Sequence, residues 1–209
     1  MDEITRTQRK TQAYWLVDGI GEVAGGTALA LVGALLVLSS VTGTEPFGTI
    51  ALFAMIFAFP ASAAVVRALK TRITYPRTGY VKYPEPSGRR RAHIAAVAIV
   101  VAVVVAGLAR SGGAADLNGP LWQAFVGAAG AAVAAVLVVR AIRSRMRRFF
   151  LSALVVLAGA GAAIAYDLGM TGGLGAVWLS LGIASIATGV AAFVSYIREH
   201  PVAEPEARS

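Results

Sequence analysis

The sequence predicts an all-α integral membrane protein with six transmembrane helices arranged as three hairpins. The first observation behind this prediction is composition: the 209-residue chain is 57% hydrophobic, contains 23 glycines and is only 14% charged. Soluble proteins are about 45–50% apolar and about 25% charged. A soluble fold of this length could not bury so much apolar surface, whereas a bilayer solvates it directly.

The second observation is six apolar runs near the length that a bilayer requires, about 17–25 residues. The third and fifth runs are close to the lower limit. The chain therefore divides into a cytoplasmic N-terminal segment, 1–13, a transmembrane domain, 14–196, with a long cytoplasmic loop, 67–92, and a cytoplasmic tail, 197–209. The predicted spans are residues 14–38, 47–66, 93–109, 121–139, 149–166 and 174–196.

The third observation is the placement of the basic residues. Eighteen of the nineteen fall in segments that these spans would leave on one side, the exception being Arg110. The positive-inside rule makes that side cytoplasmic, so the prediction is a cell-membrane protein with both termini in the cytoplasm. The basic excess then reflects topology and contact with anionic lipid headgroups, and nucleic-acid binding is not predicted. The predicted headgroup contacts are Arg89, Arg90, Arg91, Arg143, Arg145, Arg147 and Arg148.

Two acidic residues, Asp18 and Glu22, fall inside a predicted span. Charges there are costly and are candidates for function. Four residues apart on a helix, they would share one face as an intramembrane acidic pair. Such a pair either is structural or handles a proton or a cation.

The depth of this pair depends on where the first span begins. If Tyr14 and Trp15 mark the interface, both carboxylates lie in the inner leaflet. Alternatively, residues 5–22 form an amphipathic helix on the membrane and the span is Val23 to Val41. Both carboxylates would then face water or pair with cytoplasmic arginines.

The long cytoplasmic loop contains β-forming residues around Pro76 and Gly79, which favour a turn. A small β-hairpin is expected from Arg72 to Tyr83. It would serve as an ordered cap on the helix ends or as a surface for lipid or a protein partner. The residues of this candidate surface are Tyr75, Arg77, Gly79, Tyr80 and Tyr83.

Small residues spaced four apart predict close helix packing, within the chain or between copies in a homo-oligomer. The rows begin at Gly21 with Gly25, at Gly127, at Gly159 with Ala163, and at Ser180. Pro60 is expected to kink or locally break the second span.

The sequence contains no recognised catalytic or metal-binding motif. It contains no cysteine, which excludes disulfides, thiolate metal sites and cysteine nucleophiles. His93 and His200 are far apart, so no metal site is predicted, and no phosphate-binding or hydrolase motif occurs. The expectation is therefore a non-enzymatic protein without a cofactor.

The segments from Tyr14 to Gly19 with Glu22, and from Thr74 to Val81, resemble parts of small bacterial multi-pass membrane proteins. That family has no assigned function. The resemblance covers about a fifth of the chain and implies no activity, cofactor or catalytic residue.

The leading functional hypothesis is a scaffold, regulatory or accessory subunit of a membrane assembly. The alternative is a small transporter or channel in which Asp18 and Glu22 handle a proton or a cation. A third class, an enzyme acting on lipid at the cytoplasmic face, has no supporting motif.

Overall fold

The computed structural model of the protein describes residues 18–74 and 120–199, and this part of the chain is all helical. Within these two ranges, five helices are long and apolar enough to cross a membrane. They identify the chain as a membrane protein, as its composition predicts. The elements are α2 (Ile20–Thr42), α3 (Glu45–Leu69) continued by a π-helical turn η1 (Lys70–Thr74), α6 (Pro120–Ser144), α7 (Arg148–Ala165) and α8 (Gly169–Glu199).

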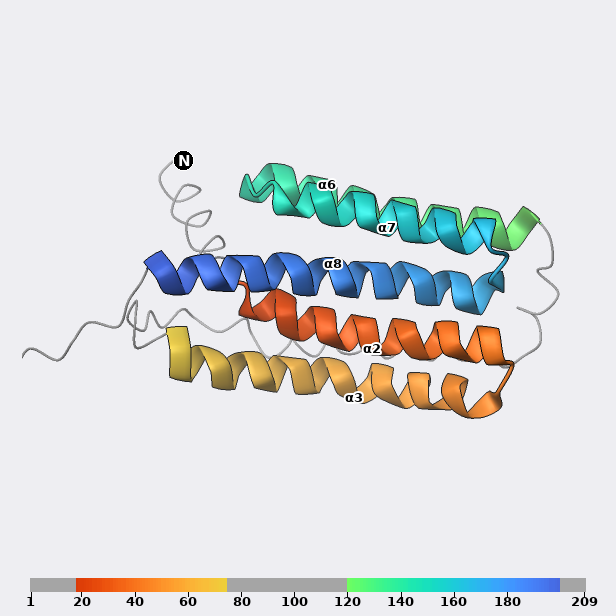
Figure 1. Cartoon of the computed structure of the whole chain (residues 1–209), viewed down its shortest axis with the longest axis horizontal. Helices are drawn as coiled ribbons and strands as arrows, with labels where there is room; N and C mark the ends of the chain where they lie inside the picture. Colours follow the sequence, from red (N-terminus) through yellow and green to blue (C-terminus); the bar gives the residue numbers. More distant parts are fainter. Residues whose placement is uncertain (1–17, 75–119, 200–209) are drawn as a thin grey trace, which may run out of the picture.

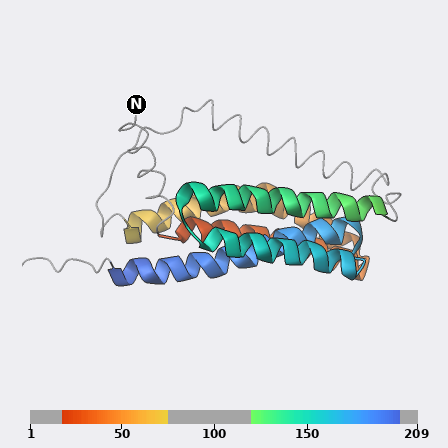
Figure 2. The ribbon, with the colours of Figure 1, turned by 90° about the horizontal axis from the view of Figure 1, so that it is seen from above.

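The five helices run along one common axis (Figures 1 and 2). The start of α2, the end of η1, the α6–α7 turn and the end of α8 gather at one end of this bundle (Figure 1). All the basic residues that the structure describes lie in the last turns of α3, α6 or α8, in η1, in the α6–α7 turn or at the start of α7, so we call this the basic end. They are Arg67, Lys70, Arg72, Arg140, Arg143, Arg145, Arg147, Arg148 and Arg198.

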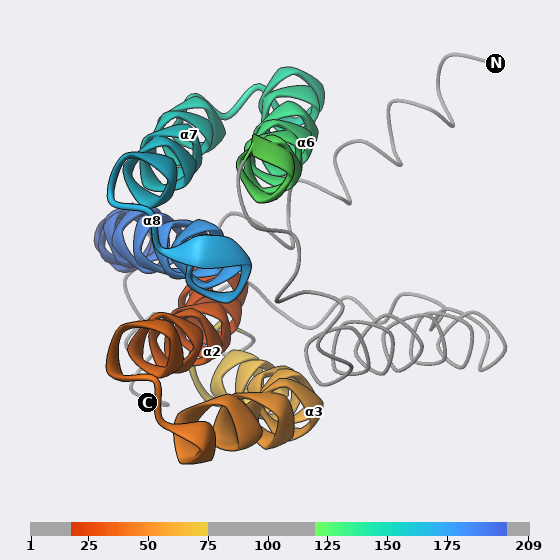
Figure 3. The same ribbon diagram turned by 90° about the vertical axis from the view of Figure 1, so that its right-hand side faces the viewer.

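Seen along the axis, the helices form an arc in the order α3, α2, α8, α7 and α6 (Figure 3). Among the described elements, α2 packs more extensively on α8 than on α3, its neighbour in sequence. Two of the three predicted hairpins are present, α2 with α3 and α7 with α8. The third predicted hairpin needs the span 93–109, which lies outside the described residues.

The hydrophobic core lies between α6, α7 and α8. Trp122 and Val126 of α6, Val156 of α7 and Val177 of α8 are almost fully buried there. Alanines fill much of the remaining interface, which keeps the three helices close together. The opposite faces of α6 and α7 expose leucine and valine, as helices facing lipid do.

The α2–α8 interface is built on glycines seven residues apart on both helices. Gly26 faces Gly182, and one heptad away in each direction lie two further glycine pairs, Gly19 with Gly189 and Gly33 with Gly175. A Cβ added at Gly26 would lie 2.9 Å from the carbonyl oxygen of Gly182, so only glycine permits this approach. Ser40 continues the series, and its hydroxyl donates to the carbonyl of Leu168 at 2.6 Å.

This seam differs from the predicted rows of small residues. A Cβ on Gly21 or Gly25 would meet nothing within 4 Å, so that predicted pair does not face a described helix. The pair Gly159 and Ala163 does face the core, where Gly159 lies against Ser180 of α8. Glycines repeated every seven residues keep the same face of each helix against its partner along the whole interface. A single pair of small residues four apart marks only one local contact.

Two local predictions are wrong, and so is part of a third. Helix α2 begins at Ile20 instead of residue 14, because Gly19 has a left-handed φ of 65° and breaks the helical path. Residues 72–74, the expected start of the β-hairpin, belong to η1; the rest of that hairpin lies outside the described residues. Helix α3 is continuous through Pro60, so the predicted local break does not occur, while the alternative of a kink there stays a prediction.

Candidate functional site: two ion pairs at the basic end

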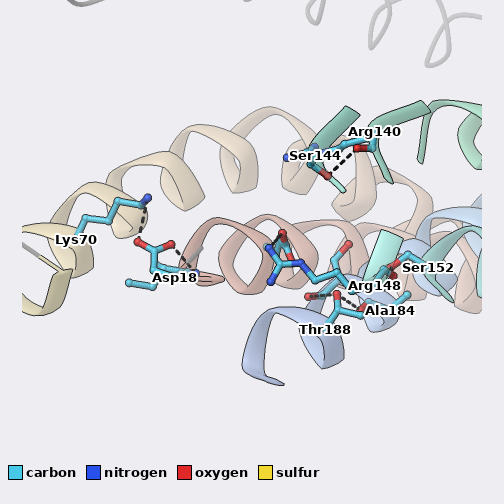
Figure 4. Close-up of polar contacts among 11 residues, drawn as sticks. Asp18, Lys70, Arg140, Ser144, Arg148, Ser152, Ala184 and Thr188 are labelled. Atoms are coloured by element: carbon cyan, nitrogen blue, oxygen red, sulfur yellow. Dashed lines mark hydrogen bonds and ion pairs between the residues drawn. The ribbon is translucent and has the colours of Figure 1, made fainter. Parts of the chain in front are cut away.

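Asp18 is a buried carboxylate at the start of the described chain, and only 1% of its side chain is exposed. Its Oδ2 lies 3.0 Å from Nζ of Lys70 and accepts a hydrogen bond from the Thr74 hydroxyl at 3.1 Å. Its Oδ1 accepts from the backbone N–H of Ile20 at 3.3 Å. The carboxylate therefore joins the first turn of α2 to the π-helical turn after α3 (Figure 4).

The π-helical turn η1 positions both partners of Asp18. Lys70 begins this turn and Thr74 ends it, and both side chains are buried. In the same turn, the Thr71 hydroxyl donates to the carbonyl of Arg67 at 2.9 Å. Helical turns of this wide type are rare and usually short. Here the turn brings a cation and a hydroxyl to one carboxylate.

Glu22 forms the second ion pair, with Arg148 at the start of α7. Oε1 of Glu22 lies 2.8 Å from Nη2 of Arg148, and the two side chains are 10% and 18% exposed. Since α2 and α7 each pack on α8, the pair connects the two helices that flank α8. Oε2 of Glu22 is buried and has no hydrogen-bond partner among residues 18–74 and 120–199.

Arg148 also belongs to an aromatic contact at the α6–α7 turn. Its guanidinium carbon lies 5.4 Å from the centroid of the buried Phe149 ring, and that of Arg140 lies 4.9 Å from the same centroid. Cations at these distances are attracted to the face of an aromatic ring. Arg148 is thereby held by Glu22 and Phe149 together.

The prediction that Asp18 and Glu22 share one helix face is wrong. Asp18 precedes α2, and the left-handed Gly19 separates it from the helix that carries Glu22. The two carboxylates have separate cationic partners on different elements, Lys70 and Arg148. Each charge is compensated within the protein, as a carboxylate buried in low dielectric requires.

Apart from Arg148, the other predicted site residues either are exposed at the basic end or lie outside the described residues. Arg143, Arg145 and Arg147 are exposed at the basic end, whereas Arg148 is partly buried in its ion pair. The loop residues Tyr75, Arg77, Gly79, Tyr80 and Tyr83, and the arginines Arg89, Arg90 and Arg91, lie outside the described residues. His93 and His200 do so as well.

Sequence reasoning did not identify Lys70 or Thr74 as partners of Asp18. Lys70 follows an apolar run and resembles any residue of a cytoplasmic flank, so its burial has no local signal. The heptad glycines of α2 and α8 were also missed, although their spacing is visible in the sequence. A search at a period of seven, instead of four, would have found them.

Within the described ranges, no three histidine, aspartate or glutamate side chains gather as a metal site would need. Searches of protein-family models, of curated proteins and of solved structures found no match to the chain.

Proposed function

We propose that this chain is a non-enzymatic, multi-pass protein of the cell membrane that acts as a scaffold, regulatory or accessory subunit of a larger assembly. The observation that carries the proposal is the internal compensation of both buried carboxylates, Asp18 by Lys70 and Glu22 by Arg148. A site that loads a cation needs negative charge left available for it. Here both negative charges instead hold helices together.

The exposed face of α3 supports association within the membrane. Among the described elements, α3 packs chiefly against α2, and it leaves Phe53, Ile56 and Phe57 more than half exposed. These side chains are spaced i, i+3 and i+4, so they share one face. In a membrane such a face contacts lipid or a neighbouring apolar helix.

The proposed topology has six spans with both termini in the cytoplasm. The end of η1 lies at the basic end of the bundle and the start of α6 at the opposite end (Figure 2). One further crossing between these two positions fits the predicted span 93–109. The basic end is proposed as the cytoplasmic end, by the positive-inside rule.

The test is gentle extraction of the full-length chain from its own membrane, followed by native mass spectrometry. The expected result is that a second protein co-purifies in stoichiometric amount, and the proposal places its binding surface on the cytoplasmic loop 67–92.

Arg77→Ala with Tyr80→Ala is expected to disperse this complex while the chain stays in the membrane. Phe53→Ala with Phe57→Ala serves as the matched comparison for contact through α3. A chain that is always alone or bound only to copies of itself contradicts the accessory-subunit proposal.

The alternative is a small transporter or channel, and one observation favours it: the buried Oε2 of Glu22 lacks a hydrogen-bond partner among the described residues. Such an oxygen is a place where a proton, a water molecule or a cation would bind. Under this alternative, Glu22→Gln abolishes proton or cation flux in reconstituted vesicles at unchanged expression. Under the accessory-subunit proposal, vesicles with the wild-type chain and with Glu22→Gln show equal background flux.

A further inference from the structure

The end of α6 and its connection to α7 carry four arginines that form no salt bridge with the described part of the chain. Residues 120–165 contain no aspartate or glutamate, and none of these four side chains forms an ion pair with the described part of the chain. Arg148 differs, because Glu22 holds it. The four are Arg140, Arg143, Arg145 and Arg147, which we call the arginine turn.

Exposed apolar side chains continue from the arginine turn toward the middle of both helices. On α6, Val139 and Val136 lie four and seven residues before Arg143, and both are exposed. On α7, Leu151 and Leu154 lie four and seven residues after Arg147, and both are at least 60% exposed. Residues at this spacing share one helix face, so each helix presents an arginine above an apolar stripe.

We propose that the arginine turn binds the headgroup of an anionic phospholipid in the leaflet at the basic end. The guanidinium groups of Arg143, Arg145 and Arg147 would contact the phosphate oxygens, and the acyl chains would lie on the apolar stripes of α6 and α7. This inference rests on the proposed insertion of the chain in a membrane, and it adds a lipid partner to that function.

The adjoining apolar stripes decide between a lipid and other anions. A free phosphate ion or a soluble acidic peptide would use the arginines but would leave the valines and leucines uncovered. A phospholipid matches both surfaces at once, because its charged group and its hydrocarbon chains are joined. Arg140 is a weaker candidate, since its guanidinium already lies over the Phe149 ring.

The test uses the purified full-length chain in detergent, offered equal amounts of phosphatidylglycerol and phosphatidylcholine and analysed by native mass spectrometry. One variant combines Arg143→Gln, Arg145→Gln and Arg147→Gln. The matched control combines Arg67→Gln, Arg72→Gln and Arg198→Gln, three exposed arginines from the same end of the bundle. Both triple variants lose the same charge, so they differ only in where the charge is lost.

The wild-type chain is expected to retain phosphatidylglycerol preferentially. An arginine that contacts the bound headgroup contributes about fivefold to its affinity, so the arginine-turn variant should lose at least about tenfold of this preference. The control variant should lose clearly less, because its three arginines lie on α3, η1 and α8, outside the proposed site. Equal losses in both variants, or no loss in either, would overturn the proposal. If inorganic phosphate bound the chain as tightly as the lipid does, the choice of a lipid over a free phosphate ion would be overturned.

Different results would contradict the proposed membrane insertion and the proposed lipid site. A chain that leaves the membrane fraction on alkaline washing contradicts membrane insertion, whatever the lipid preference of the purified protein. If the triple glutamine variant does not fold, the three single variants replace it. Each is expected to lower the preference about fivefold, and an unchanged preference in all three overturns the arginine-turn proposal.

Discussion

Replacing Lys70 by methionine is expected to destabilise the bundle by about 3–5 kcal/mol, because it leaves a buried carboxylate without its cation. Asp18 is 1% exposed and Lys70 is 4% exposed, so water cannot replace the lost partner. The Thr74 hydroxyl and the Ile20 N–H remain, but neither carries a positive charge. Thermal or denaturant unfolding of the purified chain in detergent, followed by circular dichroism, measures the loss.

The double variant Asp18→Asn with Lys70→Met is the control for this prediction. It removes both charges, so it should recover most of the stability lost in the single variant. Asp18→Asn alone should also be destabilising, since it removes the carboxylate that forms the salt bridge with the buried Lys70. Additive losses in the double variant would mean that the two residues act independently and that the ion pair is not what holds α2 to η1.

Gly26→Ala is expected to destabilise the chain by about 1–3 kcal/mol, because the added methyl group overpacks the α2–α8 seam. Its Cβ would lie 2.9 Å from both the Gly182 carbonyl oxygen and Cβ of Ser185. Backbone atoms cannot move aside as a flexible side chain can, so the two helices must separate. Gly182→Ala should act in the same direction, since its Cβ would lie 2.7 Å from the Gly26 carbonyl oxygen.

Gly25→Ala is the matched control, one residue away in the same helix. A Cβ at Gly25 meets nothing within 4 Å, so no packing is lost. Alanine in a helix interior is about 0.5–1 kcal/mol more stable than glycine, so this variant should be neutral or slightly stabilised. If Gly25→Ala and Gly26→Ala lowered stability equally, packing at the heptad seam would not explain the effect.

Much of the fold could be predicted from the sequence because apolar length is a local property. Each of the five described helices overlaps one predicted span, and the α2–α3 and α7–α8 connections lie where the loops were expected. The gathering of basic residues was also predictable, since it follows directly from which segments flank the apolar runs. These features need no knowledge of which helices touch.

The packing and the site could not be predicted in the same way. The contact of α2 with α8 joins segments more than a hundred residues apart, and hydropathy does not encode helix order. The separation of Asp18 from Glu22 depends on a single left-handed glycine, Gly19, inside a pattern that otherwise continues as a helix. Lys70 is buried because a π-helical turn, which no sequence rule anticipated, directs it toward Asp18.

Cysteine labelling in intact cells tests the central claim most directly, because the chain has no cysteine of its own. Two single-cysteine variants suffice: Thr44→Cys, in the exposed connection between α2 and α3, and Glu199→Cys, at the exposed end of α8. The α2–α3 connection and the end of α8 lie at opposite ends of the bundle, and neither change removes a basic residue. A membrane-impermeant maleimide is expected to label Thr44→Cys in intact cells and Glu199→Cys only after permeabilisation. Labelling of both variants in intact cells, or the reverse pattern, would contradict a membrane-spanning bundle with its basic end in the cytoplasm.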